Sequence, residues 1–250
     1  MSVWFDTHIH LFAPEWRQSP QELSADAAAA GIDLMLMPGV RVADWPALLA
    51  LARQLAGVYL APGLHPAYAD QWSPAAAEQL KTLTETEEVV AIGEIGLDAV
   101  TGPTLDEQER VFRAQLQIAL DAGLPVLLHS RKTTGRVLEI LRELEVGRRI
   151  GGIWHGFSGS VQVARELAEL GFRIGVGPIL LRASARKLPQ AVLDLPGDAL
   201  VLETDAPDMI DGPAGLLQVA AKLAELKGWS LAETARITSR NARQLFRLSS

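Results

Sequence analysis

The chain has 250 residues, of which 48% are hydrophobic and 21% are charged, a composition typical of a globular protein with a sizeable core. Its 30 acidic side chains outnumber 23 Lys and Arg side chains, which excludes a histone-like binder of polyanions. The absence of cysteine excludes disulfides, thiolate metal sites, iron–sulfur clusters and a cysteine nucleophile, so any metal site must use His and carboxylate ligands.

Short apolar runs alternate with stretches of helical spacing along the whole chain, and no linker or change of composition interrupts them. Eight runs predict strands, at 3–5, 34–37, 58–61, 89–92, 125–128, 150–154, 172–176 and 199–202. Helices are predicted between and after them, beginning after Ser19, Ser73 and Thr104 and covering 44–56, 134–145, 160–170, 184–193, 214–226 and 230–246.

Eight strand–helix units in this length predict a (β/α)8 TIM barrel that forms a single domain over residues 1–250. A doubly wound open sheet is the alternative. Its nucleotide-binding signatures are missing, because no G-x-G-x-x-G follows the first strand and no Walker-type lysine motif occurs. No apolar run approaches the roughly 18 to 20 residues that span a bilayer, and polar residues interrupt the first twelve positions. We therefore expect a soluble, cytoplasmic protein without a membrane partner or an obligate protein partner.

All five histidines fall at or just beyond the carboxyl end of a predicted strand, where the reactive side chains of a parallel barrel converge. They are His8, His10, His65, His129 and His155. In the sequence His8-Ile9-His10, strand alternation directs both imidazoles to one face, where they can share a cation. Alone this spacing is weak evidence, but the other histidines strengthen it.

Two carboxylates occupy comparable positions. Glu94 lies among glycines and apolar residues in a segment that otherwise has the pattern of a buried strand, and Asp205 follows the eighth strand. Each has an ordinary alternative, since Glu94 can be a core acid paired with an arginine and Asp205 can be a turn residue. A metal is the better partner for an inward carboxylate.

Six ligands are too many for one catalytic ion but suit two ions about 3.5 to 4 Å apart. We assign His8, His10, Glu94 and Asp205 to one ion. The second ion would be held by Glu94, His129 and His155. Nitrogen-rich ligands fit Zn, Mn, Co or Ni.

The motifs that carry these residues resemble those of the TatD family of metal-dependent hydrolases, which belongs to the amidohydrolase-like barrels. The matching segments, in order, are Phe5-Asp6-Thr7-His8-Ile9-His10, Gly63-Leu64-His65-Pro66, Gly93-Glu94-Ile95-Gly96-Leu97-Asp98, His129-Ser130-Arg131, His155-Gly156-Phe157-Ser158-Gly159 and Glu203-Thr204-Asp205-Ala206-Pro207. The resemblance implies the barrel, the two-metal assignment and hydrolysis of phosphodiester bonds, in several members as a 3′ to 5′ exonuclease on DNA. It also admits Mg as the working metal.

The chain departs from the family after the last motif. Many relatives carry an Arg-Asn-Glu-Pro-like loop where this chain has 208–214, which reads DMIDGPA and leads directly into a predicted helix. The departure leaves the ligand set intact and predicts an altered substrate-contacting loop.

The catalytic hypothesis is that a water bridging the two ions loses a proton, which Asp205 accepts and relays, and that the resulting hydroxide attacks phosphorus. Asp6 and Glu203 share strand faces with His8 and Asp205, so each is expected either to orient an imidazole or to be a paired core acid. His65 is expected to contact the scissile phosphate or a ligand carboxylate, with a structural histidine as the alternative.

Substrate contacts are less marked in the sequence. Arg131 is the cation most expected to bind a flanking phosphate. Three aromatic residues in the loops after the first and third strands are expected to pack within those loops, with stacking on unpaired bases as the alternative. They are Trp16, Tyr68 and Trp72. We expect weak, sequence-independent binding of a nucleic-acid end or short oligonucleotide.

Two other functions remain open at this level. One is an amidase, lactonase or esterase that uses the same metals on a small molecule, and the other is a non-catalytic metal-binding interaction protein. A basic groove open to solvent would favour nucleotides, and a closed apolar pocket would favour a small acyl substrate. Retention of Asp205 beside the other ligands argues against a purely structural metal site.

Overall fold

The computed structural model describes residues 3–248, which contain eight parallel strands and ten α-helices in alternation. The strands are β1 Trp4–Asp6, β2 Ile32–Pro38, β3 Val58–Ala61, β4 Ile92–Asp98, β5 Val126–Arg131, β6 Gly152–Trp154, β7 Phe172–Val176 and β8 Leu200–Leu202. The helices are α1 Pro20–Ala29, α2 Trp45–Gln54, α3 Pro74–Leu83, α4 Leu105–Ala122, α5 Thr134–Glu143, α6 Val146–Arg149, α7 Val161–Glu169, α8 Lys187–Asp194, α9 Leu216–Lys227 and α10 Leu231–Leu245.

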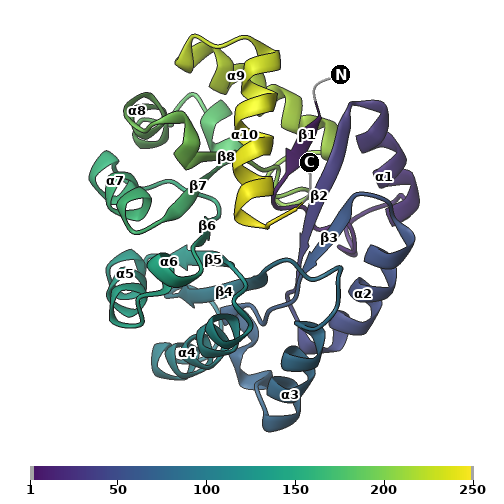
Figure 1. Ribbon diagram of the computed structural model, residues 1–250, viewed down its shortest axis with the longest axis vertical. Coiled ribbons are helices and arrows are strands. Elements are labelled where there is room, and N and C mark those ends of the chain that lie inside the picture. Colours follow the sequence, from purple (N-terminus) through teal and green to yellow (C-terminus); the bar gives the residue numbers. More distant parts are fainter. Residues whose placement is uncertain (1–2, 249–250) are drawn as a thin grey trace.

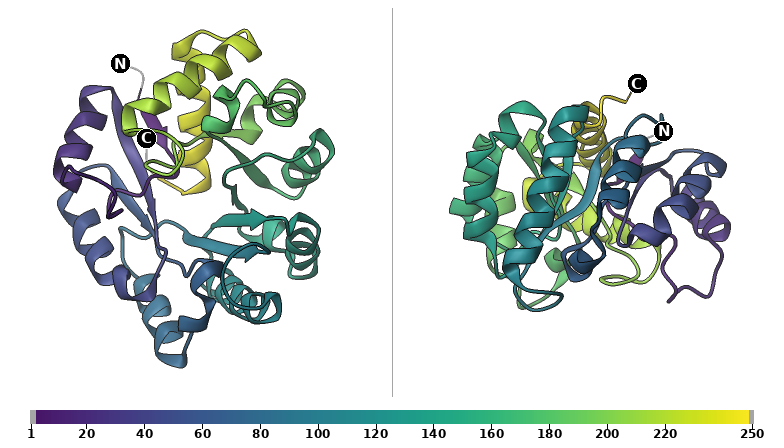
Figure 2. Two further views of the ribbon diagram at one scale, coloured as in Figure 1. Left: turned by 180° about the vertical axis from the view of Figure 1, so that it is seen from behind. Right: turned by 90° about the horizontal axis from the view of Figure 1, so that it is seen from below.

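The strands follow one another around a ring, with helices outside it (Figures 1 and 2). Continuous ladders join β1 to β3 and β4 to β8. Shorter backbone contacts join the two ladders. At one seam the Thr7 N–H donates to the Leu202 carbonyl over 2.9 Å, and at the other the Val90 N–H donates to the Leu60 carbonyl over 3.1 Å. The predicted (β/α)8 barrel is confirmed.

Glycines allow the close approach of the chain at the second seam. A Cβ on Gly63 would lie 2.5 Å from the Gly93 carbonyl carbon, and a Cβ on Gly93 would lie 2.4 Å from the Cβ of Leu127. Real side chains do not tolerate such distances. The glycines therefore bring β4 close enough for the Glu94 N–H to donate to the Gly39 carbonyl over 3.0 Å, which fixes the position of Glu94.

Two apolar layers hold the barrel together. The larger lies between the strands and the outer helices. The smaller fills the interior with alternate strand residues, including Phe5, Leu127, Ile153 and Val201. Helix α10 lies across β1 and β8 (Figure 1), and its following residue Phe246 packs against Phe5 with ring centroids 5.7 Å apart. Functional side chains can therefore gather only at the opposite end, where the strands terminate.

Several predicted boundaries need correction. The fifth strand is Val126–Arg131 rather than 125–128, and the helix predicted at 184–193 covers Lys187–Asp194. The fourth strand is Ile92–Asp98 rather than 89–92, so Glu94 lies within it. The helix predicted at 134–145 ends at Glu143, and the short helix α6 follows after Glu145, which has a φ of +52°. The helix predicted from 214 begins at Leu216, after a 3-10 turn at Pro213–Gly215. Within the described residues, no helix is long and apolar enough to cross a membrane.

Candidate metal centre at the mouth of the barrel

Several residues of the site continue the inward-facing rows of side chains that fill the barrel interior. His129 is two residues beyond Leu127, and His155 is two residues beyond Ile153, so each imidazole continues the inward face of its strand. Glu203 and Asp205 extend the inward face of β8 beyond Val201 in the same way. The site is therefore the uppermost layer of the barrel interior.

The first seam brings the beginning and the end of the barrel together. Beyond a bend at Thr7, the His8 carbonyl accepts a hydrogen bond from the Asp205 N–H over 2.8 Å. Asp6 reinforces this contact by accepting hydrogen bonds from the His8 N–H at 3.1 Å and the Thr204 N–H at 3.0 Å. Its other carboxylate oxygen accepts from the Thr204 hydroxyl at 2.6 Å. Asp6 thus positions His8 through the backbone, and its hydrogen bonds go to no imidazole.

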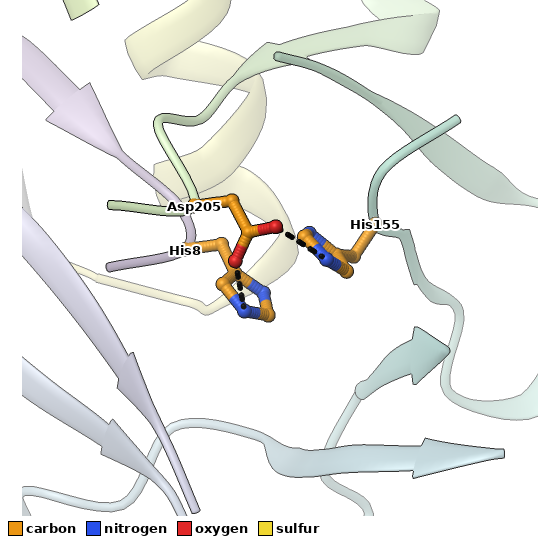
Figure 3. Close-up of side chains that lie close together, drawn as sticks. All are labelled: His8, His155 and Asp205. Carbon is orange, nitrogen blue, oxygen red and sulfur yellow. Dashed lines mark ion pairs between the residues drawn. The ribbon is translucent and has the colours of Figure 1, made fainter. Parts of the chain in front are cut away.

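One half of the site contains the H-x-H pair. The Nε2 atoms of His8 and His10 are 3.1 Å apart, and Asp205 Oδ1 lies 3.5 and 3.4 Å from them, respectively. Glu94 Oε2 lies 3.5 Å from His8 Nε2. Figure 3 shows Asp205 between His8 and His155, with its two oxygens directed to the two rings.

The other half is arranged around the second oxygen of Glu94. Glu94 Oε1 lies 2.8 Å from His129 Nδ1 and 3.8 Å from His155 Nε2. Asp205 Oδ2 lies 3.5 Å from His155 Nε2. The structure therefore brings all six predicted ligands into one cluster, in which both carboxylates contact both halves.

His65 also joins the cluster. Its Nδ1 accepts a hydrogen bond from the Ala67 N–H at 3.1 Å, and its Nε2 lies 3.3 Å from His129 Nδ1. With Glu94 and His129 it forms a group close enough to hold a metal ion. Arg131 ends β5 on the same side of the barrel, where it is exposed to solvent.

The sequence did not reveal the role of Asp98, whose Oδ2 lies 3.2 Å from His129 Nε2. This contact leaves His129 Nδ1 directed at Glu94. Glu203 holds a similar position in the other half, with Oε1 3.3 Å from His155 Nδ1 and accepting from the Gly156 N–H at 2.7 Å. Carboxylates behind imidazoles fix ring orientation and raise the basicity of the nitrogen that faces a metal.

Two buried glutamines on α4 hold the backbone behind these residues, and the sequence did not reveal them either. Gln115 accepts from the Leu64 N–H at 2.7 Å and donates to the Leu64 carbonyl at 3.1 Å, immediately before His65. Gln108 makes the same pair of bonds with Asp98, at 2.8 and 3.0 Å. Their spacing of seven residues, two helical turns, is the only local signal that they share a face.

Burial and charge act in opposite directions within the cluster. Burial lowers the pKa of His8 well below its usual value. Burial would also favour a neutral Glu94, but His155, His8 and His129 outweigh it and hold the Glu94 pKa well below its usual value. Against its own burial, His155 has its pKa raised to about 10 by Glu203, Asp205 and Glu94. The pKa directions therefore favour positive charge on His155 and disfavour it on His8.

The donor set fits divalent cations. Two imidazole nitrogens 3.1 Å apart that face the same carboxylate repel each other when neither carries a proton, unless a cation lies between them. Every group in the cluster is a nitrogen or oxygen ligand, as expected for Zn, Mn, Co, Ni or Mg rather than a thiophilic metal.

Comparison with known proteins decides the family. The family described as TatD related DNase matches residues 5–247, almost the whole chain. The chain belongs to this family. It is accordingly a TatD-family metal-dependent hydrolase, and the resemblance found in its motifs is confirmed.

Three relatives show how this TatD-family chain compares in detail. It is 34% identical to the uncharacterized metal-dependent hydrolase YabD of Bacillus subtilis, over 98% of this chain and 99% of that protein. It is 32% identical to the 3′-5′ ssDNA/RNA exonuclease TatD of Salmonella typhimurium, over 97% and 98% of the two chains. The crystal structure of YjjV from Escherichia coli superimposes with a TM-score of 0.92 at 34% identity, covering 98% of both chains.

Proposed function

We propose that the protein is a two-metal phosphodiesterase that removes nucleotides from the 3′ end of single strands or short oligonucleotides. The observation that carries the proposal is the placement of Glu94, whose two oxygens face different histidine groups in a chain that matches a family of DNases. A carboxylate in this position suits a bridge between two ions. A relative of nearly the same length is named a 3′-5′ ssDNA/RNA exonuclease, which supports cleavage of a phosphodiester bond and degradation from the 3′ end.

The ligands would divide between two ions, with Glu94 in both sets and with His155 close to Asp205 as well as to Glu94. His8, His10, Glu94 and Asp205 would hold one ion. Glu94, His129 and His155 would hold the other. When bound, the cations supply an activated water and Lewis acidity toward a non-bridging phosphate oxygen. The residues of the chain supply orientation and proton transfer.

Asp205 is the proposed general base. Its Oδ1 faces His8 and His10 and its Oδ2 faces His155, so its carboxylate spans the space between the two ligand groups. Its side chain is 15% exposed, which leaves a route for the proton to solvent. A carboxylate held by imidazoles remains ionised and can accept that proton.

His65 and Arg131 are the proposed phosphate contacts. The Nε2 atom of His65 lies at the edge of the cluster, 3.3 Å from His129 Nδ1, while its Nδ1 is occupied by the Ala67 N–H. That arrangement leaves Nε2 as the donor of a neutral imidazole. The exposed guanidinium of Arg131 suits a flanking phosphate because it remains charged at every physiological pH.

The test is to supply purified protein with each of Zn, Mn, Mg, Co and Ni in turn, with oligonucleotides labelled at either end. A phosphomonoester and a carboxylester serve as parallel substrates. Stepwise loss from the 3′ end of single strands is expected with at least one metal. Cleavage of the carboxylester alone would replace the proposal with an esterase or lactonase activity.

A further inference from the structure

A cavity of about 360 Å³ opens directly beside the candidate metal centre, between the loops that follow β1, β2, β3 and β8. His10, one of the proposed ligands, forms part of its wall. The volume lies in the range of small-molecule sites, about 300 to 1,000 Å³. A group bound in this cavity would be close to the reacting centre and can belong to the same substrate.

The walls of the cavity combine apolar and aromatic surfaces. Met37 and Leu48 are buried core residues that contribute its apolar surface. Phe12 and Tyr68 add aromatic rings, and Phe12 is 46% exposed although it is a large apolar side chain. An exposed aromatic ring beside an active site is a surface on which a flat ligand can stack.

One cation and three carboxylates add polar groups to the cavity. The cation is Arg41, whose guanidinium lies 4.9 Å from the Tyr68 ring centroid and donates to the Tyr68 hydroxyl over 3.2 Å. The acids are Glu15, Asp44 and Asp208. Asp208 lies in the segment where the chain departs from the usual family sequence.

We propose that this cavity binds the base of the terminal nucleotide, an inference that rests on the proposed exonuclease function. Aromatic rings suit the faces of a base, and the guanidinium and carboxylates suit its acceptor and donor edges. The excess of carboxylates disfavours a further phosphate within the cavity. A strand end therefore fits there better than the interior of a strand, whose next phosphate would approach these acids.

The walls do not match either mouth expected from sequence. They form neither a basic groove nor a closed apolar pocket, because acids and an arginine surround an apolar surface. An apolar acyl chain would use none of the four charged side chains, whereas a base offers them hydrogen-bonding edges. The mixture of groups therefore favours a base.

The experiment compares two short single-stranded oligonucleotides that differ only in the terminal 3′ residue, which is either ordinary or abasic. The measured quantity is the ratio of kcat/KM for the two ends. We expect the wild-type protein to prefer the ordinary end about tenfold or more, the size of one base–aromatic stack. Phe12→Ala and Arg41→Gln should reduce this ratio, and Phe12→Trp should retain it.

The matched control is Leu193→Ala, which removes an exposed apolar side chain from α8, away from the cavity. It should leave the ratio as in the wild type. Two results would overturn the base pocket: equal kcat/KM on ordinary and abasic ends in the wild type, or an equal loss of kcat/KM on both ends in Phe12→Ala. In either case, release of nucleotides from the 3′ end would still support the exonuclease function. A wild-type protein that degrades neither oligonucleotide but cleaves a carboxylester would overturn the proposed function itself, and the base pocket with it.

Discussion

The metal centre and the cavity beside it are built from different parts of the fold. The residues of the candidate centre lie in strands or in the backbone just beyond them, and they are buried or half-buried. The cavity is lined largely by loop residues, including the exposed Phe12 and Arg41. A rigid scaffold holds groups that must keep their mutual distances, while loops can vary without disturbing them.

The difference separates two kinds of mutational effect. Changes in the centre should lower activity on every phosphodiester, whereas changes in the cavity should alter the choice between substrates. The predictions that follow test this division, and the largest effect is expected for the proposed base.

Asp205→Asn should lower kcat by about 10²- to 10⁴-fold on oligonucleotides and on a small base-free phosphodiester alike, because it removes the proton acceptor. The fold should persist, since the Asp205 N–H bond to the His8 carbonyl does not need the carboxylate. Steady-state kinetics and circular dichroism measure the two properties. Asp211→Asn, an exposed acid six residues further on, is the matched control and should retain wild-type kcat. Substantial turnover by Asp205→Asn would remove Asp205 from the mechanism.

Asp98→Asn should weaken metal binding or activity by about 10- to 100-fold, the usual cost of removing the partner of a ligating histidine. The amide retains the shape of the side chain but loses the charge that faces His129 Nε2. Isothermal titration of the metal-free protein measures the affinity. Asp33→Asn, exposed at the start of β2, serves as control. An unchanged affinity would show that Asp98 does not support metal binding. Its role would then be in the turn at Thr101, whose hydroxyl donates a hydrogen bond to Asp98.

Gln115→Met should lower the free energy of unfolding by about 1 to 3 kcal/mol, because it leaves the buried N–H and carbonyl of Leu64 without their partners. Denaturant titration gives the value. Gln117→Met, on the exposed face of the same helix, is the control and should change stability little. If Gln115→Met lowers stability no more than Gln117→Met, the side chain is not needed to hold the loop that carries His65.

Arg131→Ala should raise KM for oligonucleotides only a few-fold and reduce the dependence of binding on salt by about one unit of slope. The arginine is exposed, so it can contact a phosphate without being one of the clustered residues. Titrations of KM against ionic strength make the measurement, with the exposed Arg110→Ala on α4 as control. A large loss of kcat with unchanged KM would instead place Arg131 in the reacting centre.

The clustering of the six residues could be predicted from sequence because each of them carries a local signal. His129 and His155 follow apolar strands at the spacing that keeps them on the inward face, and Glu94 is an acid among residues that are otherwise buried. The boundaries of β4 were harder to predict. Glycines 93 and 96 interrupt its apolar pattern, so the sequence favoured the more apolar 89–92, of which Val89 makes only an isolated bridge to Leu60.

The supporting contacts could not be predicted because they join distant segments. Gln115 and Leu64 are 51 residues apart, and nothing in either local pattern links them. Asp98 has the appearance of a turn residue, and indeed accepts from the backbone of Val100. The cavity depends on four loops at once, and of its aromatic residues only Tyr68 was recognised. Trp16 and Trp72 pack against the main core, as expected for loop residues.

The number of metal ions bound per chain tests the central claim most directly. Metal-free protein titrated with Zn or Mn and examined by native mass spectrometry should bind two ions, and His10→Ala should lose one of them selectively. Glu94→Gln should weaken both, because its oxygens face both ligand groups. A wild-type protein that binds one ion or none, or a Glu94→Gln variant that binds two as tightly as the wild type, would contradict the account.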